Sequence, residues 1–275
     1  MEDEKKELSF MQRVHGKAIM SVFCRNGQTV LGSLFQEGSA RLCFPKNNMA
    51  SFEAVMINTG GGLTGGDHLE WDMRLCSGTD VIVTTQAAEK IYRSLDIKKE
   101  SAKVDVSLSL SANSRLCWLP QETIIFNNSS LRRRLDVSMA EKTELLLSES
   151  IIFGRQLMGE YMDKAFLKDS WIIRQNGEVI HAEAFSLGPD IGREISMPVL
   201  FNNAGAFATI LFIAPDVQRF LKKGREIVND TGGISSWNGK LLIRLLSQDF
   251  YSLRKKLIAL LTLLNTKGAP SMWFI

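Results

Sequence analysis

The side chains best suited to binding a metal follow directly after a glycine-rich stretch. Five glycines fall within residues 60–66, and Asp67, His68, Glu70 and Asp72 come next. Oxygen and imidazole ligands suit a borderline divalent ion such as Ni²⁺. Alternation along a strand would place Asp67 on one face and the other three side chains on the opposite face. The pattern permits weak, transient metal binding, but charges on the solvated face of a strand give the same pattern.

The glycine-rich stretch is not a typical phosphate loop. It lacks the Gly-Lys-Ser/Thr ending of a Walker A motif, and a strand pattern rather than a helix follows it. We interpret it as a tight backbone path or a contact surface. The four cysteines form no Cys-x-x-Cys pair, so we expect them to be reduced and mostly buried. The sequence contains no Gly-x-Ser-x-Gly elbow and suggests no Ser/His/Asp set.

Three copies of one strand pattern must position these groups. Each copy has an alternating strand, a turn and a short apolar run, and the alternating strands begin at Leu69, Val104 and Leu131. Arg133 breaks the apolar side of the third strand. Copies at intervals of about 30 residues predict stacked β units in a solenoid-like arrangement. An antiparallel meander is the alternative.

Polar residues follow the apolar run of each copy: Gln86, then Gln121 and Glu122, then Glu149. Stacked units would bring these side chains together as a line of oxygen-bearing groups at one edge of the core. Each of them could instead simply begin a solvent-exposed turn.

Composition and the N-terminal residues limit the classes of protein to which this chain can belong. A hydrophobic content of 45% is ordinary for a soluble globular protein, and a net charge of +3 is too small to imply a nucleic-acid partner. No apolar run reaches membrane-spanning length, and the acidic first residues do not form a signal peptide, so we expect a cytoplasmic protein. Residues 1–12 are predicted to be a flexible leader and residues 13–275 a single domain.

Helical patterns occur only late in the chain. A short helix is expected from Asp216 to about Lys222, and a longer one over about 248–265, whereas residues 187–200 look like a loop. The predicted fold is therefore mainly β, with solenoid-like stacked strand repeats and two α-helices in the C-terminal half.

Several motifs together resemble the UreD family of urease accessory proteins, also called UreH. The motifs occur in order over residues 13–275: 60–67, 84–94, 118–122, Gly154-Arg155 with Gly159-Glu160, and Pro270 with Trp273. The sequence departs from the family pattern at Thr59, where Pro is frequent, and at Ser271-Met272, where Pro-Arg is common.

The resemblance implies a non-catalytic scaffold for metalloenzyme maturation. Such a protein binds UreF and, through it, the nickel-carrying GTPase UreG, docks on apo-urease, and assists nickel delivery through an internal channel. It implies transient nickel rather than a tightly bound cofactor, no nucleic-acid or membrane partner, and a homo-oligomeric state within a larger complex. A β-solenoid enzyme that uses Glu122 and Glu149 on an extended substrate is the alternative.

Two groups of candidate residues follow from the motifs and from the resemblance. The candidates for a nickel path are Asp67, His68, Glu70, Glu122, Glu149 and Glu160. The candidates for structural or partner-binding roles are Gly60, Gly61, Gly65, Gly66, Gln86, Lys90, Tyr92, Arg93, Arg155 and Trp273.

Overall fold

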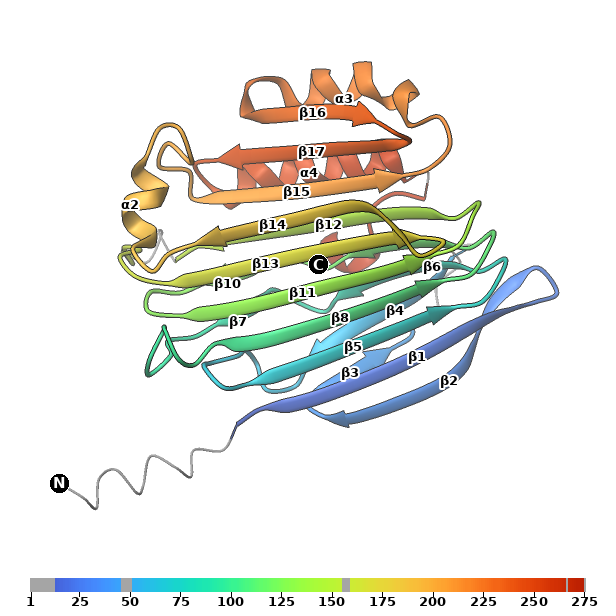
Figure 1. Ribbon diagram of the computed structural model, residues 1–275, viewed down its shortest axis with the longest axis horizontal. Helices are drawn as coiled ribbons and strands as arrows, with labels where there is room; N and C mark the ends of the chain where they lie inside the picture. The colour runs from blue at the N-terminus through green and yellow to red at the C-terminus, as the bar shows by residue number, and fades with distance from the viewer. Residues whose placement is uncertain (1–12, 46–50, 155–158, 266, 275) are drawn as a thin grey trace.

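Two β-sheets packed face to face form the body of the molecule (Figure 1). The structure is a computed structural model that describes residues 13–45, 51–154, 159–265 and 267–274. Within those residues the first sheet has seven strands and the second has ten. The prediction of a mainly β fold is confirmed, while the predicted leader, residues 1–12, lies outside the described residues.

The first sheet is built mostly from parallel strands, in the order β14-β13-β11-β8-β5-β1-β2. Its strands are β1 (His15–Arg25), β2 (Gln28–Gly38), β5 (His68–Leu75), β8 (Ala102–Leu110), β11 (Ser130–Met139), β13 (Phe166–Gln175) and β14 (Glu178–Leu187). Hairpins at Asn26-Gly27 and Asn176-Gly177 add the two edge strands, β2 and β14. Both residues of each turn have positive φ, which Asn and Gly tolerate best.

The second sheet has the order β16-β17-β15-β12-β9-β6-β4-β3, and the short strands β7 and β10 pair beside it. Its strands are β3 (Ala40–Cys43), β4 (Phe52–Asn58), β6 (Asp80–Thr85), β7 (Glu89–Ile91), β9 (Arg115–Leu119), β10 (Thr123–Ile125), β12 (Glu144–Phe153), β15 (Ala206–Ile213), β16 (Gly232–Trp237) and β17 (Lys240–Ser247). Strands β4, β6, β9 and β12 are parallel, and β15 joins β12 antiparallel.

The chain passes repeatedly from one sheet to the other, as from β5 to β6 and from β8 to β9. Equivalent strands of the three predicted copies therefore pair in parallel: Trp71 lies beside Val106, and Val106 beside Leu135. This register agrees with the predicted repeat, and the meander alternative is wrong for this part of the chain. Both sheets keep open edges in the described residues, and the predicted solenoid-like arrangement is not confirmed.

Among its described residues, the C-terminal half has three α-helices, not two: α2 (Ile191–Ser196), α3 (Leu221–Val228) and α4 (Phe250–Leu264). The longest matches its prediction, and Asp249 caps it by accepting a hydrogen bond from the Ser252 amide at 2.8 Å. Helix α2 falls in the predicted loop. The Asp216 side chain caps no helix, and its backbone has a left-handed conformation. A 3₁₀ turn, Val217–Phe220, lies between Asp216 and α3.

Apolar residues form two layers, one between the sheets and one between the second sheet and α4. Trp118 and Trp171 lie in the inner layer, whereas Leu257 and Leu260 of α4 lie in the outer one. Of the cysteines, Cys117 is buried and the other three are exposed, so the expectation of mostly buried cysteines is wrong. No helix in the described ranges has the length and apolar character needed to cross a membrane.

Candidate functional site

Three charged side chains meet in the inner layer, between the two sheets. Arg133 on β11 and Asp169 on β13 are direct neighbours in the first sheet, and Glu149 reaches them from β12 of the second. One guanidinium nitrogen of Arg133 lies 2.5 Å from a carboxylate oxygen of Asp169, and the other donates to Glu149. Their side chains are only 6%, 9% and 5% exposed, in the order Arg133, Asp169, Glu149. A buried ion cluster of this kind needs further hydrogen bonds to offset the cost of desolvation.

Two tryptophans supply part of that support. The indole nitrogen of Trp118 donates to Glu149 at 3.0 Å, and that of Trp171 donates to Asp169 at 3.1 Å. The Nε of Arg133 is buried without a hydrogen-bond partner. The guanidinium is therefore held at its tip, through two carboxylates from opposite sheets.

The strand register explains why these charges face inward. Arg133 lies beside Val104, which in turn lies beside Leu69, so it occupies a position that is apolar in the first two copies. This is the same break in the apolar pattern that is visible in the third copy. Period-2 alternation leaves the side chain no route to the solvated face.

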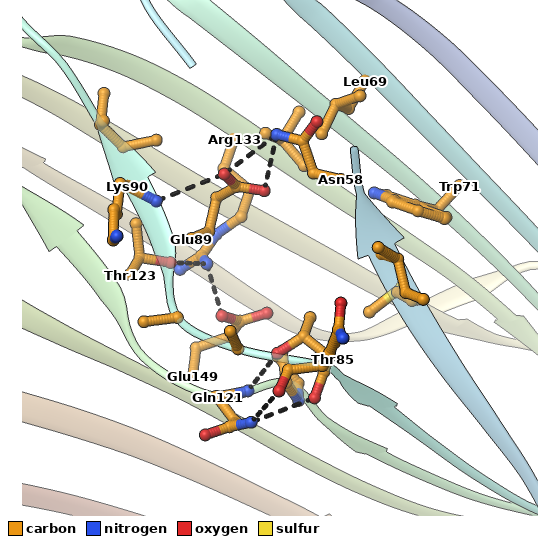
Figure 2. Close-up of a pocket in the computed structure, with 18 of the residues that line it drawn as sticks. Asn58, Leu69, Trp71, Thr85, Glu89, Lys90, Gln121, Thr123, Arg133 and Glu149 are labelled. Atoms are coloured by element: carbon orange, nitrogen blue, oxygen red, sulfur yellow. Dashed lines mark hydrogen bonds and ion pairs between the residues drawn. The ribbon is translucent and has the colours of Figure 1, made fainter. Parts of the chain in front are cut away.

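Two cavities of about 340 Å³ each adjoin the cluster, and Arg133 and Glu149 line both of them. The first lies beside β7, and Figure 2 shows the polar groups on its wall: Asn58, Thr85, Glu89, Lys90, Gln121 and Thr123. The second is lined by Asp169, Trp171, Glu183, Thr209 and Arg244, among others. Exposed residues line each of them: Gln86 and Lys90 in the first cavity, Val199 and Leu200 in the second. The two cavities thus extend from the protein surface to a shared, charged partition.

Two carboxyl groups here, those of Glu149 and Glu89, have pKa values close to neutral pH. Burial raises the pKa of Glu149 to about 7, although Arg133 acts in the opposite direction. Burial also raises the pKa of Glu89 to about 7, against the hydrogen bonds donated by Asn58 and the Lys90 amide. Burial alone would lower the pKa of Arg133, but Asp169 and Glu149 raise it, so this residue remains charged. With both partners ionised the cluster has a net charge of −1, which favours a cation nearby.

The raised pKa of Glu89 predicts a measurable pH dependence of stability. The folded value of about 7 exceeds the ordinary value of 4.5, so its contribution is complete below pH 4.5 and is lost as the pH rises through 7. Replacing Glu89 with Gln keeps a hydrogen-bond acceptor and should remove about 1–2 kcal/mol of the fall in stability between pH 5 and pH 8. Urea denaturation at both pH values measures this. Glu226→Gln, at an exposed position, is the control; equal pH dependence in both variants would contradict the prediction.

Comparison with known proteins agrees with the motif pattern. A family model described as UreD urease accessory protein matches residues 14–273. The chain belongs to the UreD family. Urease accessory protein UreD 1 of Brucella abortus biovar 1 is 43% identical over 270 residues, covering 96% of this chain and 95% of the relative. Urease accessory protein UreD of Mesorhizobium japonicum is 42% identical over 267 residues, covering 95% and 94%.

In this UreD protein the polar residues that follow the buried strands only partly converge. Gln86, Gln121 and Glu149 line the first cavity. The side-chain nitrogen of Gln121 donates to the backbone carbonyl of Gln86 at 2.9 Å. Glu122 instead forms an ion pair with Arg254 of α4 at 3.1 Å. Three of the four predicted polar residues thus line one cavity, and Glu122 does not.

The residues after the glycine-rich stretch do not gather at one point. Asp67 is buried and accepts hydrogen bonds from the Val14 and Thr64 amides at 2.8 and 2.7 Å. His68 pairs with Asp105, and Glu70 pairs with Lys17 at 2.9 Å, both across neighbouring strands. Across the described parts of the chain, no group of three or more His, Cys, Asp or Glu side chains is arranged to hold a metal ion.

The glycines of the UreD motif let the chain pass closely over the segment that follows β7. A Cβ on Gly62 would lie 2.3 Å from the Tyr92 ring, and one on Gly65 would lie 2.2 Å from the Ser94 hydroxyl. Gly61 and Gly66 have positive φ, and the Gly60 amide donates to the side chain of Asn58. The stretch is thus a tight backbone path, in which Gly62 and Gly65 pack against the segment that follows β7.

The other candidates from the family motifs lie apart from the ion cluster. Lys90 lines the first cavity, Tyr92 is 42% exposed, and the Arg93 carbonyl accepts a hydrogen bond from the Thr64 hydroxyl. Glu160 accepts a hydrogen bond from the Asn127 amide at 3.2 Å. Trp273 is buried against the second sheet, and Arg155 lies outside the described residues.

Sequence reasoning did not name three members of this site as candidates: Asp169, Glu89 and Arg133, which was noted only as a break in the apolar pattern. The signal for Arg133 was present, because a charge on the apolar side of a buried strand must find a partner. Asp169 lies next to Lys168 in a strand that also alternates. Which of these two side chains points inward depends on where β13 begins, and that start was not predicted. Glu89 sits in a three-residue strand, too short for any period to show.

Proposed function

We propose that this chain is a non-catalytic scaffold that acts in the cytoplasm and helps to deliver nickel to apo-urease, and that the metal passes between the two sheets. It would act in more than one copy, with UreF and UreG homologues. Membership of the UreD family supports the role in urease maturation. Nickel is the cargo of this process and is held only transiently.

One observation carries the passage itself: the two cavities meet at Arg133 and Glu149. The route is lined by a few carboxyl and amide groups on largely apolar walls, which suits weak, sequential contact with a cation. Tight ligation would trap the metal. The exposed side chains of Val199 and Leu200 beside the second cavity are the kind of apolar surface that a partner protein covers.

Filling the first cavity tests the passage. Val104 lines it and is only partly buried, so Val104→Phe places a ring in the route. We expect urease activation to fall by about tenfold or more, equivalent to about 1.4 kcal/mol, while the complex with the accessory proteins still forms. The measurements are urease activity and nickel content in a strain that lacks its own UreD, together with co-purification of the UreF and UreG homologues.

Val179→Phe is the matched control, because Val179 is 57% exposed and lines neither cavity. Thermal denaturation of both variants separates a blocked route from overpacking, which costs about 1–3 kcal/mol. Normal urease activation by Val104→Phe would contradict the proposed passage of nickel between the sheets. A wild-type chain that neither bound these partners nor restored urease activity would contradict the scaffold role.

The geometry supports the scaffold better than the alternative of a β-solenoid enzyme that acts on an extended substrate through surface carboxylates. That alternative relied on Glu122 and Glu149 acting on one substrate, but Glu122 pairs with Arg254 of α4, whereas Glu149 lies between the sheets with Arg133. Glu122 lines neither of the two cavities that Glu149 lines.

A further inference from the structure

The guanidinium of Arg133 occupies a position lined by oxygen atoms. Carboxylates of Glu149 and Asp169 approach it from opposite sheets, and the hydroxyl of Thr123 lies 3.4 Å away. Two carboxylates and a hydroxyl are the ligands that a divalent cation selects in proteins. The arrangement is that of a cation site whose present occupant is a side chain.

The attachment of Arg133 is confined to the tip of its side chain. Its Nε has no hydrogen-bond partner, so the strong contacts are confined to the two terminal nitrogens. Space is available on both sides, since the residue lines both cavities. The first cavity also contains the carboxyl group of Glu89, a second acceptor for the displaced guanidinium.

We propose that Glu149 and Asp169 form a divalent-cation site that Arg133 keeps closed, and that the metal enters when the guanidinium moves into the first cavity toward Glu89. Charge favours the exchange: two carboxylates with one guanidinium leave a net charge of −1, whereas two carboxylates with one divalent ion are neutral. Competition from Arg133 keeps the affinity low and the occupancy brief. The identity of the metal as nickel rests on the proposed function; the existence of the site does not.

Direct binding of Ni²⁺ to the purified full-length chain tests the proposal without urease. Arg133→Met removes the competing cation while keeping an unbranched side chain. We expect equilibrium dialysis to show one additional bound ion, with an affinity at least about tenfold higher than that of the wild type. Ni²⁺ should also raise the melting temperature of this variant more than that of the wild type.

Arg133→Lys covers the case in which the methionine variant does not fold. Lysine keeps the charge but cannot bridge two carboxylates as the planar guanidinium does, so the affinity should be intermediate. Arg133→Met/Glu149→Gln should lose the gain. Arg254→Met, which removes the partner of Glu122 outside the cavities, should show none.

Two results would overturn the proposal: no gain in affinity in either single Arg133 variant, or a gain that persists when Glu149 is also replaced. These outcomes are independent of the passage. If Val104→Phe activates urease normally while Arg133→Met gains a Ni²⁺ site, the proposed nickel passage is wrong. The proposed cation site that Arg133 keeps closed then stands. If Val104→Phe blocks activation while neither Arg133 variant gains affinity for Ni²⁺, the proposed cation site is wrong and the passage stands.

Discussion

Replacing Arg133 with methionine is expected to lower the free energy of unfolding by about 3–5 kcal/mol in metal-free buffer. The substitution leaves Glu149 and Asp169 buried without their counter-charge, and the folded protein must then either carry unpaired charges or keep the carboxyl groups protonated. Urea denaturation at pH 7 measures the loss. The matched control is Arg134→Met at the next position, where the side chain is 64% exposed and pairs with Asp136 on the outer face. That change should cost no more than about 0.5 kcal/mol.

The loss of stability in Arg133→Met should be larger at high pH than at low pH. The pKa of Glu149 is already raised to about 7, and removal of Arg133 takes away an influence that lowers it. Because the folded value lies above the unfolded one, stability is retained at low pH and falls as the pH rises. The variant should therefore be closer to the wild type at pH 5 than at pH 8. A deficit that is the same at both pH values would show that packing, and not charge, explains the loss.

Replacing Trp273 with alanine is expected to cost about 3–5 kcal/mol. The indole is 3% exposed and donates to both the Thr84 hydroxyl and the Leu119 carbonyl at 3.1 Å. Arg254 of α4 donates to the Trp273 carbonyl at 2.6 Å and stacks over the ring at 5.3 Å. This one residue thus links β6, β9 and α4. Its loss removes a large apolar contact and leaves the Arg254 side chain less constrained.

Chemical denaturation of Trp273→Ala beside Phe274→Ala separates this role from a general effect of the tail. Phe274 is 65% exposed, so its truncation should change stability by less than about 0.5 kcal/mol. Similar losses in the two variants would contradict the anchoring role. If the Trp273 variant stays stable but loses its partner proteins on purification, the residue belongs to an interface instead.

The strand repeats could be predicted because burial imposes a period of two. Trp71, Val106 and Leu135 fall on one inward face in each copy, and the sequence assigns each of them to the apolar side of its strand. The ion cluster could be predicted only in part. Arg133 and Glu149 were noticed, but their meeting depends on the packing of one sheet on the other, which no local pattern describes.

Helix α2 was not predicted, and the short helix expected from Asp216 to about Lys222 corresponds only to a 3₁₀ turn and the first residues of α3. Helix α2 has six residues and α3 has eight, so neither is long enough to show a clear apolar stripe, and tertiary contacts stabilise both. Strand β16 begins with Gly232 and Gly233, which read as a turn. The hydrogen bonds of Asp67 could not be predicted either: its carboxylate was a candidate metal ligand, and it accepts hydrogen bonds from the Val14 and Thr64 amides.

The alternation of the chain between the sheets also bears on the order of assembly during synthesis. In the region from β5 to β13, each parallel strand finds its partner in the segment made just before it, so pairing can follow the ribosome instead of waiting for the C-terminus. Arg133, Glu149 and Asp169 span 37 residues and can meet once β13 has emerged. The charged partition would then form while α4 and Trp273 are still unmade, and the outer layer would close over a finished interior.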